Sequence, residues 1–201
     1  MKKYLLPENG NFYKANLHCH STVSDGTLTP EEIKRQYMEK GYSIVAYTDH
    51  NVMLPHHDLS DEKFLALTGY EMNINDTKIA EGGSGKTCHL CYVALSPDID
   101  TQVCWHREKY GKTIDPQLRA RAKFDESLPD YERFYTPECI NDMIKKGVQA
   151  GFFVTHNHPT WSGERYTDYM AYEGLSAMEI STTAVRPWAI PTTIRGYMMI
   201  C

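Results

Sequence analysis

Residues 29–50 read TPEEIKRQYMEKGYSIVAYTDH, and this stretch decides the fold class. Thr29 is a helix-capping residue, Pro30 suits the first helical position and two glutamates follow, so we predict a helix that runs to Gly41. Residues 43–47 then form a short apolar run rich in β-branched and aromatic side chains, which is typical of a buried strand. A capped helix, a glycine and a buried strand together form a repeating unit of an α/β fold.

The same pattern continues on both sides of this stretch. The predicted strands are residues 13–17, 43–47, 64–68, 87–94, 151–155 and 177–180. A second helix begins with the cap Thr136 and ends near Gly147 or Gly151. This order predicts a parallel sheet with helices outside it. Residues 96–135 are charged and partly aromatic, and we expect a helical insertion there, either a lid or a solvated excursion.

Length and composition limit the function classes. A chain of 201 residues with 41% hydrophobic residues favours one folded domain, residues 1–201. The net charge of −5 excludes a general nucleic-acid binder, although a local cationic pocket is compatible with it. The first twenty residues hold no apolar stretch long enough for a signal peptide or a membrane span. We therefore expect a cytoplasmic protein whose six cysteines are reduced.

Metal-ligating side chains follow most of the predicted strands. They are His18, His20 and Asp25, then Asp49 and His50, Glu71, His89, and finally His156 and His158. The carboxyl ends of parallel strands share one edge of a sheet, so these side chains should converge. A His-x-His pair on a strand places both imidazoles on one face, and imidazoles with carboxylates suit Zn²⁺, Mn²⁺ or Fe²⁺. The sequence therefore predicts a metal site.

These segments resemble the motifs of a known family. His18-x-His20 with Ser24-Asp25-Gly26, Thr48-Asp49-His50, Glu71, His89 and the segment Thr155-His156-Asn157-His158-Pro159 resemble the polymerase and histidinol phosphatase (PHP) domain family over about residues 13–180. The resemblance implies a distorted seven-stranded β/α barrel, similar to a TIM barrel. It also implies two or three divalent ions at the strand ends and hydrolysis of phosphate esters.

The resemblance further implies which residues bind the ions. The ligands would be His18, His20 and Glu71 for the first ion, Glu71, His89 and His156 for the second, and Asp25 and His50 for the third. Two ions sharing a water molecule lower its pKa, so the expected nucleophile is a metal-bound hydroxide and the bridging Glu71 is catalytic. His158 would either protonate the leaving alcohol or bind phosphate.

The expected substrate is a small phosphorylated molecule, such as histidinol phosphate or a nucleotide. Cationic side chains in the insertion, Arg107, Arg119 and Arg121, are the predicted substrate contacts. The sequence predicts no membrane partner and disfavours extended nucleic acid. It leaves the oligomeric state open.

The chain departs from the family pattern near its end. PHP domains supply a late Asp-x-His, and none precedes Cys201. Residues 181–201 lack helical or strand periodicity, which a shifted reading frame or a truncation would explain. We therefore expect an incomplete barrel that lacks its last strands. Only the second ion site would then be complete, and hydrolysis would be impaired.

Two other functions fit parts of the pattern. A metal-dependent amidohydrolase also begins a β/α barrel with His-x-His, but its ions often share a carboxylated lysine, whereas Glu71 fills that place here. A degenerate module that binds metal for stability or for interaction would show metal-dependent melting without phosphate release.

Overall fold

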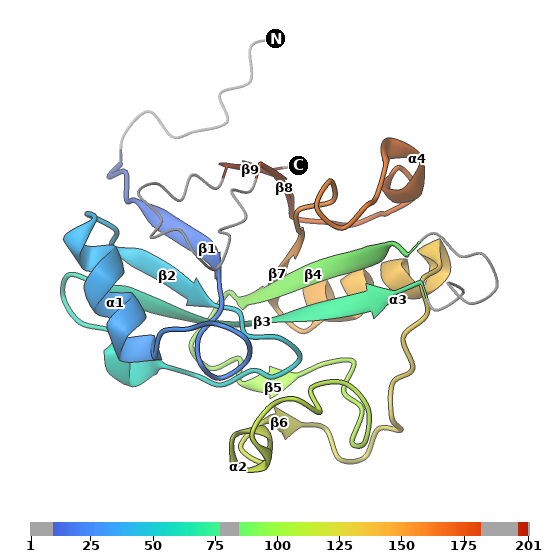
Figure 1. Cartoon of the computed structure of the whole chain (residues 1–201), viewed down its shortest axis with the longest axis horizontal. Helices are drawn as coiled ribbons and strands as arrows, with labels where there is room; N and C mark the ends of the chain where they lie inside the picture. Colours follow the sequence, from blue (N-terminus) through green and yellow to red (C-terminus); the bar gives the residue numbers. More distant parts are fainter. Residues whose placement is uncertain (1–9, 77–84, 182–196, 201) are drawn as a thin grey trace, which may run out of the picture.

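A curled, seven-stranded sheet forms the centre of the molecule (Figure 1). The computed structural model describes residues 10–76, 85–181 and 197–200. In spatial order the strands are β1 (Ala15–Cys19), β2 (Ile44–Tyr47), β3 (Leu65–Asn75), β4 (Thr87–Ala94), β7 (Phe152–His156), β8 (Ala177–Ser181) and β9 (Tyr197–Ile200). Every strand predicted from the sequence corresponds to one of these, within two residues at each end except for β3, which continues to Asn75, seven residues beyond the predicted end.

The predicted all-parallel arrangement is wrong for part of the sheet. Strands β1, β2 and β3 are parallel, as are β7 and β8, but β4 runs antiparallel to both β3 and β7, and β9 is antiparallel to β8. β3 ends at Asn75 and β4 begins at Thr87. This separation is too short for the helical crossover that a parallel pair needs. The fold is therefore mixed α/β.

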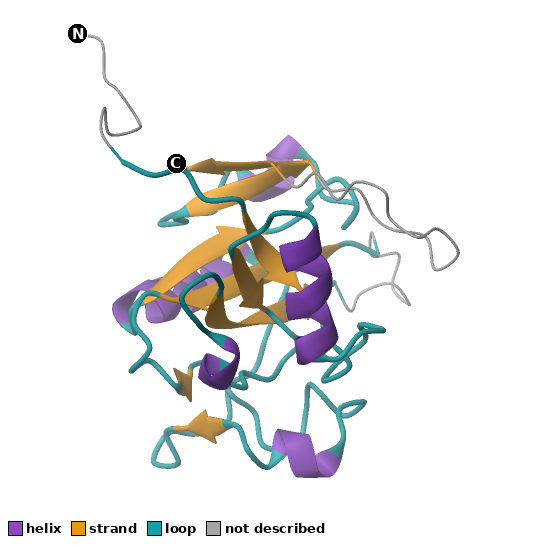
Figure 2. Ribbon diagram, turned by 90° about the vertical axis from the view of Figure 1, so that its left-hand side faces the viewer, coloured by secondary structure: helices purple, strands orange, loops and turns teal. Residues whose placement is uncertain are grey.

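Two long helices pack on the sheet (Figure 2). Both cover the same face of β3, because Ala66 packs with α1 and Tyr70 and Met72, of the same alternation, pack with α3. Helix α1 (Pro30–Glu39) starts with the predicted cap, in which the Thr29 side chain accepts from the Glu32 amide. Helix α3 (Pro137–Gln149) starts in the same way at Thr136. Buried residues of α1 pack on β1, β2 and the start of β3, and those of α3 pack on β3, β4 and β7.

Strand alternation then assigns each side chain to a face. On β3, Tyr70 and Met72 belong to the core beneath α3, so Glu71 between them points to the opposite face. On β4, Leu90 belongs to that core, and His89 points away from it. The face without helices therefore receives the polar side chains, and we call it the inner face.

The insertion between β4 and α3 is mostly irregular and not helical, contrary to the prediction. It contains β5 (Thr101–Gln102) paired with β6 (Lys123–Phe124), and one short helix, α2 (Pro116–Arg119). Positive φ angles at Tyr110 and Gly111 interrupt any helical run. Side-chain contacts hold the segment instead, among them the stacked rings of Trp105 and Phe124.

Three further segments complete the described chain. They are the 3-10 helix η1 (His57–Leu59), the short helix α4 (Tyr166–Tyr169) and the backbone of β9. The expectation of an atypical tail concerns residues 181–201, of which 182–196 and 201 lie outside the described residues. None of the described helices has the length and apolar character needed to cross a lipid bilayer.

Candidate metal centre

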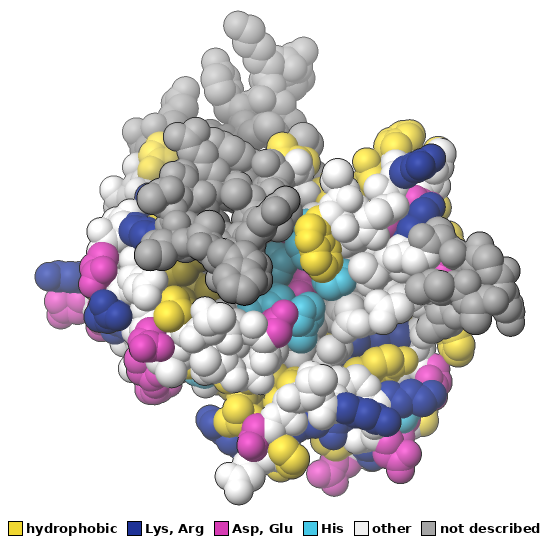
Figure 3. All heavy atoms as spheres, viewed as in Figure 1, with side chains coloured by type: hydrophobic (Ala, Val, Ile, Leu, Met, Phe, Trp, Pro, Cys, Tyr) yellow, Lys and Arg dark blue, Asp and Glu magenta, His cyan; other side chains and the backbone are white. Residues whose placement is uncertain are grey.

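Glu71 lies at the centre of a cluster of histidines on the inner face. Its carboxylate is completely buried, and five imidazoles approach its two oxygens. The nitrogen–oxygen distances are 3.3 Å to His18, 3.0 Å to His20, 3.2 Å to His50, 3.1 Å to His89 and 3.2 Å to His158. We call these six residues the Glu71 cluster. Three of them lie in strands β1, β3 and β4, and the other three lie in the segments that follow β1, β2 and β7. Figure 3 shows histidines gathered in a hollow of this face.

The loop after β1 holds the acidic member predicted for the third ion. Asp25 accepts a hydrogen bond from His20 Nδ1 at 2.7 Å and lies 3.7 Å from His50 Nε2. Asp49, on the neighbouring strand end, accepts from the backbone amides and hydroxyls of Ser21 and Ser24. Asp49 thus fixes the loop that presents Asp25.

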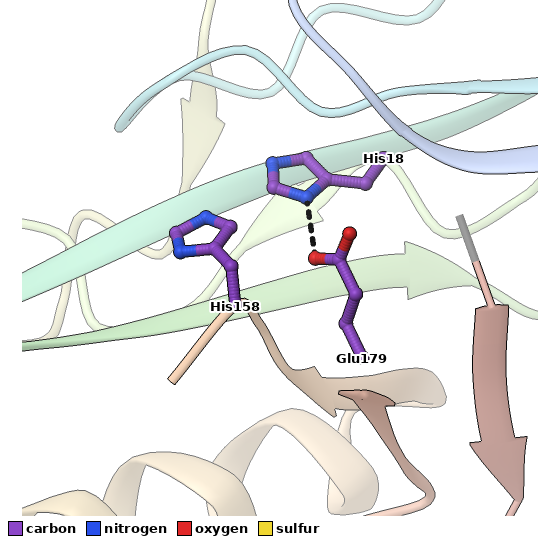
Figure 4. Close-up of side chains that lie close together, drawn as sticks. All are labelled: His18, His158 and Glu179. Carbon is purple, nitrogen blue, oxygen red and sulfur yellow. Dashed lines mark hydrogen bonds and ion pairs between the residues drawn. The ribbon is translucent and has the colours of Figure 1, made fainter. Parts of the chain in front are cut away.

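His18 faces partners that the sequence analysis missed. Its Nδ1 lies 3.2 Å from Glu179 Oε2, and its ring stacks on that of His158 with centroids 5.2 Å apart (Figure 4). The side-chain nitrogen of Asn157 lies 2.9 Å from the same Nδ1. In the predicted strand 177–180, Glu179 lies two residues after Ala177 and therefore points to the same face as that buried residue. The sequence thus did indicate a buried carboxylate at the end of this strand.

His156 is not part of the Glu71 cluster, contrary to its predicted place beside Glu71 and His89. Its ring points to the helix-covered face, where Nε2 lies 2.6 Å from Glu164 Oε2. β7 ends at His156, and the chain then turns, with a positive φ of 32° at His158. Because regular alternation stops there, His158 reaches the inner face and takes the position expected for His156.

The charges in the cluster stabilise one another. Burial acts to raise the pKa of Glu71, but the charge of His18 and hydrogen bonds from His158, His18 and His20 outweigh it and hold this pKa well below its usual value. Burial lowers the pKa of His20, but its hydrogen bonds to Asp25 and Glu71 raise it to about 9. The hydrogen bond from His20 lowers the pKa of Asp25 to about 2.

The donor set fits divalent cations. His50 Nδ1 is buried 3.2 Å from Glu71 Oε2, yet this nitrogen forms no hydrogen bond with any described residue. His18 Nε2 and His20 Nε2 face each other at 3.0 Å, which requires a proton or a cation between two nitrogens. Ligand atoms within 4.8 Å of one another occur in the groups His20–His50–Glu71, Glu71–His89–His158, His18–Glu71–Cys91 and His18–His158–Glu179. Nitrogen and carboxylate donors of this kind suit first-row divalent ions.

The arginines predicted to contact substrate have partners inside the insertion. Arg107 pairs with Asp130 at 2.7 Å, and Arg119 donates to the His106 carbonyl at 2.8 Å. Arg121 is exposed just after α2. Within the described ranges, the hydrogen bonds and ion pair of Arg107 and Arg119 all remain inside the insertion, so the role of the three arginines stays a prediction.

Two other side chains border the cluster. Arg133, at the end of the insertion, is buried and donates to the Asn51 side chain, next to His50. Trp161 is 62% exposed, and its ring centroid lies 5.1 Å from that of His158 and 5.9 Å from that of His89. The centre therefore has a buried cation and an exposed aromatic ring at its edge.

Comparison with known proteins gives three findings. Residues 16–152 match the family described as the PHP domain. Over 79 residues the chain is 42% identical to a 5'-3' exoribonuclease of Haemophilus influenzae, a match that covers 38% of this chain and 27% of that protein. A crystal structure of a two-domain protein containing a predicted PHP-like metal-dependent phosphoesterase, from Bacteroides vulgatus, aligns with a TM-score of 0.38 and 17% identity. That alignment covers 76% of this chain and 37% of the other.

The chain thus spans about a quarter of the length of its curated relative and little more than a third of the solved structure. The family match, in contrast, covers more than half of the chain and includes most of the Glu71 cluster.

Proposed function

Because the chain belongs to the PHP domain family, we propose that it hydrolyses phosphate esters with the help of bound divalent metal ions. The observation that carries this proposal is the convergence of five imidazoles on the buried carboxylate of Glu71. Without bound cations such a cluster would have to share protons among closely spaced rings. The proposal also includes a (β/α)7-type barrel and two or three bound ions.

The ligand sets follow the observed groups. We assign His20, His50 and Glu71 to one ion, with Asp25 orienting His20 through its Nδ1. A second ion is assigned to Glu71, His89 and His158, so His158 replaces the predicted His156. Glu71 is shared by both sets, as the bridging role requires. Manganese, iron and zinc are all compatible with these donors.

The protein's own residues prepare the site for this chemistry. When bound, the ions would supply Lewis acidity that lowers the pKa of water and neutralises phosphoryl oxygens. Glu71 keeps its negative charge at neutral pH because its pKa is held low, which makes it a permanent ligand. Asp25 and Glu179 each contact the Nδ1 atom of one histidine and so fix the orientation of the rings of His20 and His18.

The rim of the site favours a nucleotide among small phosphate esters. Trp161 exposes a large aromatic surface beside His89 and His158, and stacking on such a ring is worth about 1–3 kcal/mol per nucleobase. Arg133 adds a positive charge near His50. The curated relative is named an exoribonuclease, which agrees with a nucleotide as the phosphate ester that is hydrolysed.

A phosphate-release assay tests the proposal. The 201-residue protein, loaded in turn with Mn²⁺, Fe²⁺ and Zn²⁺, is given nucleoside monophosphates, a 5'-phosphorylated oligoribonucleotide, glycerol phosphate and a cyclic amide. We expect release of inorganic phosphate from the monoesters or of nucleotides from the oligoribonucleotide, and higher kcat/KM for the nucleotide substrates. Glu71→Gln should lose at least 100-fold in kcat/KM, about 2.7 kcal/mol of transition-state stabilisation.

The exposed acid Glu173 provides a matched control, because Glu173→Gln removes the same charge away from the cluster. Hydrolysis of the cyclic amide alone would replace the proposal with the amidohydrolase alternative. Metal-dependent melting with no turnover of any ester would leave the metal-binding module.

A further inference from the structure

A second cluster of ligand-type side chains lies on the opposite face of the sheet from Glu71. It consists of Cys88 in β4, His156 at the end of β7 and Glu164 in the loop before α4, and we call it the outer cluster. One ligand atom from each of the three lies within 4.8 Å of the other two. Cys88 and His156 are completely buried and Glu164 is 5% exposed. The outer cluster shares no residue with the Glu71 cluster.

Hydrogen bonds define the surroundings of Glu164. Its Oε2 lies 2.6 Å from His156 Nε2, and its Oε1 accepts from the hydroxyls of Tyr135 at 3.0 Å and Tyr172 at 2.8 Å. Tyr172 also lies within hydrogen-bonding reach of Cys88. The ligand atoms of Cys88, His156 and Glu164 thus lie together in the interior, and two tyrosine hydroxyls contact the carboxylate.

One polar atom in this arrangement has no partner. His156 Nδ1 is buried and forms no hydrogen bond with any described residue. A buried polar atom in that state usually costs about 1–3 kcal/mol. If His156 is protonated to neutralise Glu164, its second N–H lacks an acceptor, and if it is neutral, the carboxylate lacks a counter-charge. The described residues thus leave either a buried N–H without an acceptor or a buried, hydrogen-bonded carboxylate without a counter-charge.

A divalent cation would supply the missing counter-charge. Two positive charges balance the Cys88 thiolate and the Glu164 carboxylate, while His156 remains neutral. His156 would bind the ion through Nε2, the ring nitrogen that faces Glu164, and the ion would replace the 2.6 Å hydrogen bond between these two side chains. A thiolate selects zinc over manganese, magnesium or calcium, and buried zinc sites are typically four-coordinate, so one tyrosine oxygen would supply the remaining ligand.

We propose that Cys88, His156 and Glu164 form a structural zinc site, separate from the ions of the Glu71 cluster. The site connects β4, the end of β7 and the loop of residues 157–164. That loop also carries His158 and Trp161, so zinc at the outer cluster would position both side chains at the edge of the inner face. This inference does not depend on the proposed phosphoesterase activity.

Cobalt substitution tests the proposal through a signal that only a thiolate ligand produces. The 201-residue protein is stripped of metal under reducing conditions and titrated with Co²⁺ while the near-ultraviolet thiolate-to-cobalt charge-transfer band is recorded. The Glu71 cluster also takes up cobalt, so we expect a band whose final intensity corresponds to one thiolate-bound cobalt per chain, and which disappears in Cys88→Ser. Cys91→Ser is the matched control, since Cys91 is also buried on β4 but faces His18 and Glu71, and the band should persist in it.

Two results would overturn the proposal. One is a wild-type protein that binds cobalt without any thiolate band, which would leave the outer cluster as a hydrogen-bond network. The other is a band that disappears in Cys91→Ser and persists in Cys88→Ser. If Cys88→Ser does not fold, as judged by circular dichroism, X-ray absorption of the zinc-loaded Cys91→Ser protein decides. A sulfur neighbour at about 2.3 Å from zinc supports the site, and its absence contradicts it.

Discussion

His20 and Asp25 form the shortest ion pair of the metal centre, and their shifted pKa values predict how the metal-free protein responds to pH. The pKa of His20 is raised from 6.5 to about 9, so its contribution to stability is complete below pH 6.5 and is lost as the pH rises through 9. The pKa of Asp25 is lowered from 3.8 to about 2, so its contribution is complete above pH 3.8 and is lost as the pH falls through 2.

We therefore expect the melting temperature of chelator-treated protein to be highest between about pH 4 and pH 6.5 and to fall toward pH 9. Thermal unfolding followed by circular dichroism across this range measures the effect. His20→Gln should show a smaller decline above pH 6.5 than the wild type. A melting temperature that rises over that interval would contradict the assignment of the raised pKa to His20.

At the scale of single residues, the sequence indicated most of the site because its spacing follows strand geometry. His18 and His20 were expected on one face, and both contact Glu71. His156 and His158 have the same spacing but face opposite sides, because the strand ends at His156 and a left-handed residue follows. Where a strand ends within such a motif depends on tertiary packing, which the spacing alone does not contain.

At the scale of elements, apolar runs and helix caps were sufficient to locate six strands of the main sheet and both long helices, but they missed β9 and the second half of β3. These signals did not predict strand direction, because the apolar composition of β4 suits a buried strand that runs either parallel or antiparallel to β3. The insertion shows a similar limit. Its charged residues suit an exposed helix, but Arg107 and Asp130, for example, pair across an irregular segment instead. Such pairings between residues far apart in the sequence leave no periodic signal.

Gly147 tests how closely α3 packs on the sheet. A Cβ atom added there would lie 2.3 Å from Tyr92 Cε1 and 2.8 Å from Val154 Cγ2. Gly to Ala inside a helix usually stabilises by about 0.5–1 kcal/mol. Tyr92 is completely buried and has no room to move away, so we expect Gly147→Ala to destabilise by about 1–3 kcal/mol.

Urea unfolding measures this free energy, and Val148→Ala on the exposed side of α3 is the control, with an expected change within about 0.5 kcal/mol. Equal or greater stability of Gly147→Ala would mean that the helix stands farther from Tyr92 than the structure shows.

At the scale of the whole molecule, the metal centre joins two parts of the sheet. The parallel strands β1, β2 and β3 contribute or precede His18, His20, His50 and Glu71, whereas β4 and the chain after β7 contribute His89 and His158. The sheet joins these parts through the β3–β4 pair, and Glu71 lies in that pair opposite Cys91. Cations held by both parts should therefore stabilise the fold as a unit.

Removal of metal should lower the melting temperature of the entire domain. A ligand at 100 times its Kd stabilises the folded state by about 2.7 kcal/mol. For a chain of this length each kcal/mol corresponds to about 2–4 °C, so we expect Mn²⁺ to raise the melting temperature of chelated protein by about 5–11 °C. Manganese is the appropriate probe because a thiolate site such as the outer cluster disfavours it. Differential scanning calorimetry should show one cooperative transition that shifts, with the full shift in Cys88→Ser and a reduced shift in His20→Asn. An unchanged melting temperature at saturating Mn²⁺, or a shift abolished only in Cys88→Ser, would mean that the Glu71 cluster does not bind the metal that stabilises the fold.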